Sequence, residues 1–457
     1  MSLFSKLSHI NMLEGSLWDK LILFSLPLAL TNVLQQLFNT ADVAVLGHYV
    51  GRDAMASVGS LTPLIGLFVN LFLGISLGAN VVIARHFGSK AKDAIVAASN
   101  SAFLLALVLG LGCFVCCFPF SRGILTLLAV PEEIIPASQE YLQYYLLGLP
   151  FLSLYNFIAA MLRSQGDTTS PFISLGIASI LNIGLNLCAV CLFDLGVAGV
   201  AMATSLSNCL SALLLLFVAA RRSVFGLFRQ SQRPKRPEMA EIIRIGFPAA
   251  IQGMVFCFSN IIVQSAINSL GANVIAGSAA AFTVEINLYC LMSAFAQAGT
   301  TFVSQNFGAR NLRRCLTVTR VTLALTLPLN IVMSVLILLA APSLLGFFTQ
   351  DPAVAETAML RIWYIVAPNV VTIFIDVLSG ALRGYGCSMP PAIATLVSIC
   401  CVRIVWVFTI FRWFPTFDTL LLSYPLSWLV TAIFITIVYL RFKRVVLFHK
   451  HSITIKR

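Results

Sequence analysis

The sequence predicts an all-α polytopic membrane protein with twelve transmembrane helices in two parallel six-helix repeats. Three observations predict this fold. Of the 457 residues, 59% are hydrophobic and only 10% are charged, whereas soluble domains carry about 25% charged residues. Apolar segments long enough to span a bilayer recur along the whole chain. The two halves of the chain also repeat short motifs at a constant spacing.

The apolar segments are numerous enough for twelve spans. A helix needs roughly 20 apolar residues to cross the hydrocarbon core of a membrane. The first segment is too long for the apolar core of a cleaved signal peptide, so we expect it to stay in the protein. The predicted spans lie near residues 21–47, 58–84, 97–118, 137–161, 172–193, 198–220, 241–267, 277–303, 317–341, 358–381, 391–411 and 423–442.

Two motifs occur twice, 220 positions apart. LRSQGDTTSP at 162–171 returns as LRGYGCSMPP at 382–391, and FGSK at 87–90 returns as FGAR at 307–310. Six spans per half is an even number, so both halves enter the membrane from the same side and the repeat is parallel. Duplicated halves are typical of secondary transporters, whose substrate site lies between them.

The repeat also sets the predicted domain organisation. A basic segment with two prolines separates the halves and is expected to be extended. Residues 1–20 fit an amphipathic lead-in and a disordered tail equally well. The predicted segments are a cytoplasmic N-terminal segment (1–20), an N-lobe (21–220), a cytoplasmic linker (221–240), a C-lobe (241–442) and a basic cytoplasmic tail (443–457).

Topology explains the net charge of +12. Most of the 29 Lys and Arg residues fall in loops on one side of the membrane. Such a bias sets the orientation of membrane proteins, with the basic loops inside. We therefore expect both termini in the cytoplasm and the basic tails against anionic lipid, which leaves no need for a nucleic-acid partner.

Few charged residues fall well inside the predicted spans. A charge in mid-membrane costs about 2.5–3.5 kcal/mol on insertion scales, so each one needs a reason. The acidic ones are Asp42, Glu285 and Asp376, and the basic one is Arg403. These four residues are the first candidates for function.

Asp42 is the strongest of these candidates. It shares a helix face with Gln35 and Asn39, at i, i+4 and i+7, and Gln36 makes this span more polar still. We expect that face to look into the helix bundle or a cavity, and Gln35, Gln36 and Asn39 are candidates for lining a substrate cavity. A desolvated carboxyl group favours its neutral form, which suits Asp42 to take up a proton or to exchange it for Na⁺. The alternative is a structural Asp bonded to helix ends.

Neutral polar residues in other spans fit the same site. Asn182 and Asn186 stand at i and i+4 in the fifth span, and Thr204 lies in the sixth. Amide and hydroxyl oxygens can bind a hard cation or pair with a carboxyl group. Alone, such residues more commonly join helices. Their role therefore depends on convergence with Asp42.

The second half carries its own acidic residues. Glu285 and Asp376 define a possible second protonation or cation site, and the alternative is structural pairing, for example with Arg403. Asp42 has no acidic counterpart there, because Ile262 and Val263 stand at the matching positions. The sequence therefore predicts that ion binding differs between the two halves.

The duplicated loop motif is interpreted as scaffold. Arg163 and Arg383 are expected to anchor helix ends through backbone carbonyls or lipid phosphates. Gly166 and Gly386 fit helix-ending turns. Pro27, inside the first span, is the expected hinge. We expect no enzymatic activity and no cofactor, because the chain has no HExxH, GxSxG or phosphate-loop motif. Transport would then be driven by an ion gradient.

The chain resembles the multidrug and toxic compound extrusion (MATE) transporters, and the bacterial DinF/MepA-like type in particular. The resemblance covers residues 15–442. It implies a MATE/MOP-type V-shaped bundle of two six-helix lobes around a central cavity. Five segments carry it, namely FNTADVAVLGHYVG after Pro27, ARHFGSK, LRSQGDTTSP, GVAGVAMATSLS and VSQNFGARN.

This resemblance implies efflux of organic cations and other amphipathic drugs by alternating access, in exchange for H⁺ or Na⁺. It also implies a monomer in the bacterial inner membrane. DinF-type members form an N-lobe cation site from a first-helix Asp, a fifth-helix Asn and Asp, and a sixth-helix Thr. Asp42, Asn182 and Thr204 match three of these positions. Asn186 replaces the expected Asp, which removes a negative charge and favours protonation of Asp42 over Na⁺ binding.

Two alternatives stay open. A flippase for lipid-linked precursors, from the same superfamily, should carry several basic residues in its cavity, whereas Arg403 is the only basic residue expected in mid-span. A passive channel or membrane scaffold would move nothing uphill and would not need Asp42. Transport measurements in vesicles with an imposed ion gradient separate these possibilities.

Overall fold

The computed structural model describes residues 10–454, except 129, 223–232 and 347–350. The described residues form helices and no strands. Twelve of the described helices are long and apolar enough to cross a membrane, which confirms the predicted all-α fold with twelve spans. They are Trp18–Tyr49, Ala54–Gly88, Lys92–Cys117, Ile135–Ser164, Thr169–Leu192, Gly196–Arg221, Arg236–Asn268, Ala272–Gly308, Leu312–Gly346, Pro352–Gly384, Met389–Trp413 and Phe417–Val445.

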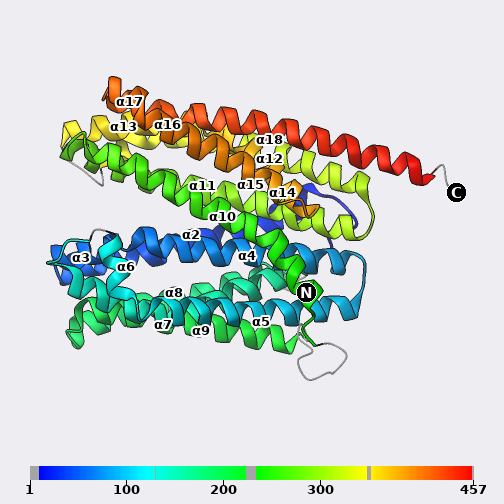
Figure 1. The fold of residues 1–457 in the computed structure, drawn as a ribbon, viewed down its shortest axis with the longest axis horizontal. Coiled ribbons are helices and arrows are strands. Elements are labelled where there is room, and N and C mark those ends of the chain that lie inside the picture. The colour runs from blue at the N-terminus through cyan, green and yellow to red at the C-terminus, as the bar shows by residue number, and fades with distance from the viewer. Residues whose placement is uncertain (1–9, 129, 223–232, 347–350, 455–457) are drawn as a thin grey trace. The chain divides into compact units, whose positions relative to one another are not determined.

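The first of two compact units comprises Met1–Met254 and Ser304–Asn311. In this unit α7 packs against α4, α5 and α9, while α8 packs against α2 and α9 (Figure 1). Its helices are α2 (Trp18–Tyr49), α3 (Arg52–Gly59), α4 (Thr62–Gly88), α5 (Lys92–Cys117), α6 (Ser121–Leu127), α7 (Ile135–Ser164), α8 (Thr169–Leu187), the π-helical turn η1 (Cys188–Leu192), α9 (Gly196–Arg221) and the first part of α10 (Arg236–Asn268).

The second unit comprises Val255–Val303 and Leu312–Arg457. Here α14 packs against α12 and α18, and α13 packs against the same two helices. The predicted boundaries of the lobes stay a prediction. The helices are the rest of α10, most of α11 (Ala272–Gly308), α12 (Leu312–Gly346), α13 (Pro352–Val366), η3 (Ala367–Asn369), α14 (Val370–Gly384), α15 (Met389–Thr395), η4 (Leu396–Cys401), α16 (Val402–Phe408), α17 (Ile410–Trp413) and α18 (Phe417–Thr454).

Two spans of the second unit are irregular, although the sequence predicts continuous helices there. The tenth span breaks at the 3₁₀ turn η3, which contains Pro368; a proline has no N–H to donate to the preceding turn. The eleventh span contains the π-helical turn η4 directly before α16. Asp351 caps the start of α13, because its side chain accepts a hydrogen bond from the Ala353 N–H at 2.9 Å.

The duplicated loop motif ends a helix in the same way in both units. The residue after each glycine donates its N–H to a leucine carbonyl, that of Leu162 at 3.0 Å and that of Leu382 at 2.9 Å. This is the Schellman pattern, which needs a left-handed residue at its centre. Gly166 and Gly386 supply it, with φ of +97° and +83°. The repeat is therefore structural as well as sequential.

The structure describes the N-terminal segment from Ile10 onward, so the two alternatives for residues 1–20 stay predictions. Between Ile10 and α2 the chain is not helical, and it packs within the first unit. Ile10 donates its N–H to the carbonyl of Gly166 at 3.3 Å, and Asn306 Nδ2 donates to the carbonyl of Met12 at 3.1 Å. Met12 is fully buried. Residues 1–9, half of the predicted linker (223–232) and the last three residues of the basic tail lie outside the described residues. The last five residues of the predicted linker are not extended, because α10 begins at Arg236.

The second duplicated motif lies at a close backbone crossing in the first unit. A Cβ atom added to Gly88 would lie 1.8 Å from the carbonyl oxygen of Gln305. A Cβ atom added to Gly308 would lie 1.9 Å from the carbonyl oxygen of Arg85. The two glycines occupy the same place in FGSK and FGAR, so the two contacts follow the repeat. Only a residue without a side chain fits at either position.

We expect Gly88→Ala to lower the melting temperature of the purified protein by several degrees. The added methyl group meets backbone, which cannot move aside like a side chain, and overpacking costs about 1–3 kcal/mol. Gly112→Ala is the matched control, because nothing lies within 4 Å of a Cβ atom there. Equal melting temperatures for the two variants would contradict the close crossing.

Candidate functional site

Three helices of the first unit bring four predicted residues together. Asp42 comes from α2, Asn182 and Asn186 from α8, and Thr204 from α9. Asn186 Nδ2 donates to Asp42 Oδ1 at 2.7 Å, and Thr204 Oγ1 donates to Asp42 Oδ2 at 2.6 Å. Asn182 completes the cluster, since its Nδ2 donates to Thr204 Oγ1 and its Oδ1 accepts from Asn186 Nδ2, both at 3.3 Å.

The cluster is buried and holds one negative charge at most. Asp42 is 2% exposed, and the two asparagines are fully buried. Among the residues that the structure describes, no Lys, Arg or His forms an ion pair with Asp42. The buried Oδ1 atom of Asn186 has no hydrogen-bond partner there either. A buried carboxylate with only neutral donors is costly, so a proton or a cation would stabilise this site.

The local backbone places Asn186 at a special position. α8 ends at Leu187 and continues directly as the π-helical turn η1. Insertions of this kind interrupt regular helix pairing and are frequent at functional sites. The i, i+4 spacing of Asn182 and Asn186 puts both amides on the face of α8 that meets α2 and α9. The sequence signalled the shared face but not the π turn.

Two tyrosines that the sequence analysis missed lie near the cluster. Tyr141 and Tyr145 on α7 are electrostatic neighbours of Asp42. Both side chains are buried, and their rings stack with centroids 6.1 Å apart. Their i, i+4 spacing inside an apolar span was a signal that they share one face. The two neutral side chains add no counter-charge near Asp42.

The described side chains of Gln35, Gln36 and Pro27 in α2 are not part of this cluster. Gln35 and Gln36 are half-buried, while the side chain of Asn39 lies outside the described residues. Pro27 is buried within α2, and Thr31 Oγ1 donates to its carbonyl at 2.7 Å. The predicted substrate contacts of the three amides stay a prediction, as does the hinge at Pro27.

The acidic residues of the second unit are paired with different arginines. Glu285 accepts from Arg361 Nε at 2.9 Å and from Arg361 Nη2 at 3.0 Å. Arg383 is the charged neighbour of Asp376. Arg361 was missed as a buried charge, because it stands near the start of a predicted span, where basic residues commonly reach the interface. A second coupling site built from Glu285 and Asp376 stays a prediction.

The anchoring residues lie at helix ends, as their loop position suggests. Arg163 Nε donates to the carbonyl of Ala159 at 3.1 Å, within its own helix. Asp167, in the same loop, caps α8 by accepting from the N–H of Thr169 at 3.0 Å, and it forms an ion pair with Arg222. Asp167 was missed, and Cys387 at the matching position has no carboxylate for this role.

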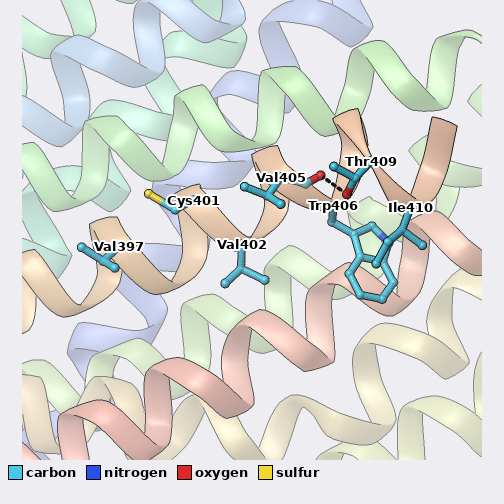
Figure 2. A pocket seen from close by; sticks show the side chains of 7 residues that line it. All are labelled: Val397, Cys401, Val402, Val405, Trp406, Thr409 and Ile410. Carbon is cyan, nitrogen blue, oxygen red and sulfur yellow. Dashed lines mark hydrogen bonds between the residues drawn. The ribbon is translucent and has the colours of Figure 1, made fainter.

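Each of the two units contains an apolar pocket among the described residues. Figure 2 shows the pocket in the second unit, which lies along η4, α16 and the start of α17. It has a volume of about 390 Å³, and no predicted site residue lines it. The other has a volume of about 430 Å³ and lies between α2 and α8. Its lining includes Phe38 and Ile183, which lie about one helical turn from Asp42 and Asn186, respectively, along the chain. It offers an apolar surface close to the buried carboxylate.

Twelve spans in two parallel repeats, with a buried carboxylate cluster, define a polytopic membrane transporter. The chain belongs to the MatE family, because the model of that family matches it twice, over residues 27–188 and 248–409. The two matches correspond to the two repeats. This confirms the resemblance that the sequence motifs indicated.

Curated relatives point to the same family. The chain is 31% identical over 400 residues to a probable multidrug resistance protein NorM of Thermotoga maritima, and these residues are 86% of this chain and 86% of the relative. It is 27% identical to the probable multidrug resistance protein YoeA of Bacillus subtilis, over 84% of this chain and 85% of the relative. It is 25% identical to the multidrug export protein MepA of Staphylococcus haemolyticus, over 76% of this chain.

Solved structures share the fold at lower sequence identity. A crystal structure of MATE in complex with MaL6 has a TM-score of 0.89 at 20% identity and covers 97% of this chain and 99% of its own. An outward-facing multidrug resistance MATE transporter of the MOP superfamily has a TM-score of 0.87 at 21% identity, and the match covers 95% of this chain and 97% of that transporter. The predicted fold class is therefore confirmed.

Proposed function

We propose that the protein exports amphipathic, mainly cationic drugs in exchange for protons, by alternating access, with Asp42 taking up the proton. The names of the relatives support drug export. The observation that carries the coupling proposal is the buried Asp42 carboxylate, which neutral side chains hold and which has no basic ion-pair partner in the described part of the chain. We further propose a monomer in a bacterial inner membrane, with both termini in the cytoplasm.

Protonation would change the bonding of the cluster. The ionised carboxylate accepts hydrogen bonds from Asn186 and Thr204. The neutral acid has one O–H donor and fewer acceptor sites, so at least one of these bonds must rearrange. Asn186 Oδ1 is a free acceptor in the same cluster. Because the partners come from α2, α8 and α9, the proton would alter contacts among three helices at once.

The energy of one proton suits this task. One charge that moves through 100 mV supplies about 2.3 kcal/mol. A tenfold gradient of a neutral drug costs about 1.4 kcal/mol, so one proton per neutral drug sustains roughly a fiftyfold gradient. A monovalent cation exchanged one for one gains nothing from voltage and depends on the pH difference alone.

Purified protein in vesicles tests the proposal. We expect an imposed pH difference to drive a cationic dye uphill, and we expect a Na⁺ gradient at equal pH to drive none. Uphill transport with Na⁺ alone would make Na⁺ the coupling ion. Dye that only equilibrates across the membrane would contradict ion-coupled export and favour a passive channel.

Asn186→Asp is expected to change the ion dependence. The substitution adds a second carboxylate beside Asp42, and two carboxylates with neutral oxygens form a stronger site for a hard cation. We expect Na⁺ to stimulate dye transport by the variant several-fold and to leave the wild type unchanged. An unaltered ion dependence in a folded variant would contradict the role of this cluster in ion selection.

A lipid flippase is the second candidate function. The sequence suggested one buried basic residue in mid-span, but the second unit buries two, Arg361 and Arg403. An anionic lipid-linked precursor would need such residues. Lipid scrambling in vesicles without any ion gradient, together with the absence of dye export, would favour this candidate over drug export.

A further inference from the structure

Arg403 is a fully buried guanidinium in the second unit. It lies on α16, and its two hydrogen-bond partners are neutral. Its Nε donates to Ser427 Oγ and its Nη1 donates to Asn260 Oδ1, both at 3.2 Å. Its Cζ atom lies 4.3 Å from the centroid of the Tyr424 ring. Its buried Nη2 atom has no hydrogen-bond partner among the described residues.

A second guanidinium approaches the same tyrosine. Arg361 lies 5.9 Å from the Tyr424 centroid, donates to Ser278 and forms the ion pair with Glu285. The carboxylate of Glu285 thus balances one of the two arginines. No carboxylate in the described part of the chain forms an ion pair with Arg403. A buried charge is normally paired, so this cluster lacks one negative charge.

The cluster occupies the same helices of the repeat as the Asp42 site. The first, fifth and sixth spans of the first repeat supply Asp42 and its partners, and the same spans of the second repeat supply Arg403 with Asn260, Ser427 and Tyr424. Arg361 comes from the fourth span of the second repeat. Counted from the start of each family match, Arg403 in the second repeat stands at the same position as Asn182 in the first. Tyr424 lies 220 positions after Thr204. The charge is inverted between the repeats: an acid in the first, a base in the second.

We propose that the second unit contains a binding site for one anionic group, centred on Arg403 and flanked by Tyr424 and Arg361. A guanidinium favours planar anions such as a carboxylate, which it can bind through two N–H groups. This inference rests on the proposed drug export and deepens it: the substrates include zwitterionic amphiphiles, whose carboxylate enters this site. An inorganic anion such as chloride would fill the same place for substrates without a carboxylate.

A matched pair of substrates tests the proposal in vesicles with an imposed pH difference. The probes are a fluoroquinolone, which carries a carboxylate, and its methyl ester, which does not. We expect wild-type protein to transport both, and we expect Arg403→Gln to lower transport of the acid at least tenfold more than transport of the ester. Replacing chloride with gluconate is the second arm. If chloride fills the site, this replacement lowers wild-type transport of the ester alone, and Arg403→Gln removes that dependence.

The outcomes separate this inference from the proposed function. Equal losses for acid and ester, without any chloride dependence, would overturn the anion site but leave drug export intact. If wild-type protein transports neither probe, drug export fails, and the site is judged by melting temperature in detergent. The acid or chloride should then raise the melting temperature of the wild type but not that of Arg403→Gln, and no rise in the wild type overturns the site. If Arg403→Gln does not fold, Arg403→Lys is used in its place. The lysine keeps the positive charge but lacks the planar guanidinium, so we expect Arg403→Lys to bind the acid about tenfold more weakly than the wild type does.

Discussion

Asp42→Asn is expected to abolish uphill drug export without unfolding the protein. The amide has nearly the same shape as the carboxyl group and can still accept one hydrogen bond, from Thr204 or from Asn186. It cannot take up a proton in the physiological range, so the exchange of drug for ion loses its energy source. We expect the gradient of a cationic dye, which an imposed pH difference sustains in the wild type, to fall close to one. Dye accumulation in inverted vesicles measures this directly.

Two comparisons make the result specific. Asp194→Asn is the matched control: Asp194 is an exposed carboxylate in the loop after η1, and its positive φ of 51° suits Asn as well as Asp. We expect this variant to export dye like the wild type. Asp42→Glu keeps an ionisable group in place and should retain part of the coupling. Full uphill export by Asp42→Asn would show that the ion binds elsewhere.

The sequence indicated which residues form the site, but it did not indicate how the helices bring them into contact. The i, i+4 spacing of Asn182 and Asn186 fixes one helix face, whatever the fold, because it follows from helix geometry. That this face meets Asp42 depends on the packing of α8 against α2 and α9, which joins residues 144 and 162 positions apart. No local pattern encodes such contacts. The resemblance to MATE transporters supplied them as an expectation.

The fold was predictable where one physical requirement dominates. Bilayer thickness fixes the length of a span, so the twelve spans could be placed from hydropathy. The helix-ending turns could be predicted because a left-handed residue strongly favours glycine. The break at η3 and the π turns were missed, since they depend on how neighbouring helices re-pair the freed backbone groups. Arg361 was missed because its partner Glu285 lies 76 positions away.

Breaking the Glu285–Arg361 pair is expected to give the largest loss of stability. Glu285→Gln leaves Arg361 charged, buried and close to Arg403, so the second unit would hold two uncompensated guanidinium groups. Removing one partner of a buried ion pair costs about 3–5 kcal/mol. Glu241→Gln is the matched control, because it breaks the more exposed pair of Glu241 (38% exposed) with Arg85 (24% exposed). Ion pairs near the surface contribute about 0–1 kcal/mol. Reversible unfolding in mixed micelles measures both losses.

The double variant Glu285→Gln/Arg361→Met decides what the pair does. It removes both charges together, so we expect it to regain most of the stability that Glu285→Gln loses, because no lone charge stays buried. A structural pair should also leave the pH dependence of transport unchanged in the double variant. If Glu285→Gln is as stable as the wild type but transports with an altered pH dependence, Glu285 takes up a proton during transport. Ion coupling would then extend to the second unit, and Asp42 would not act alone.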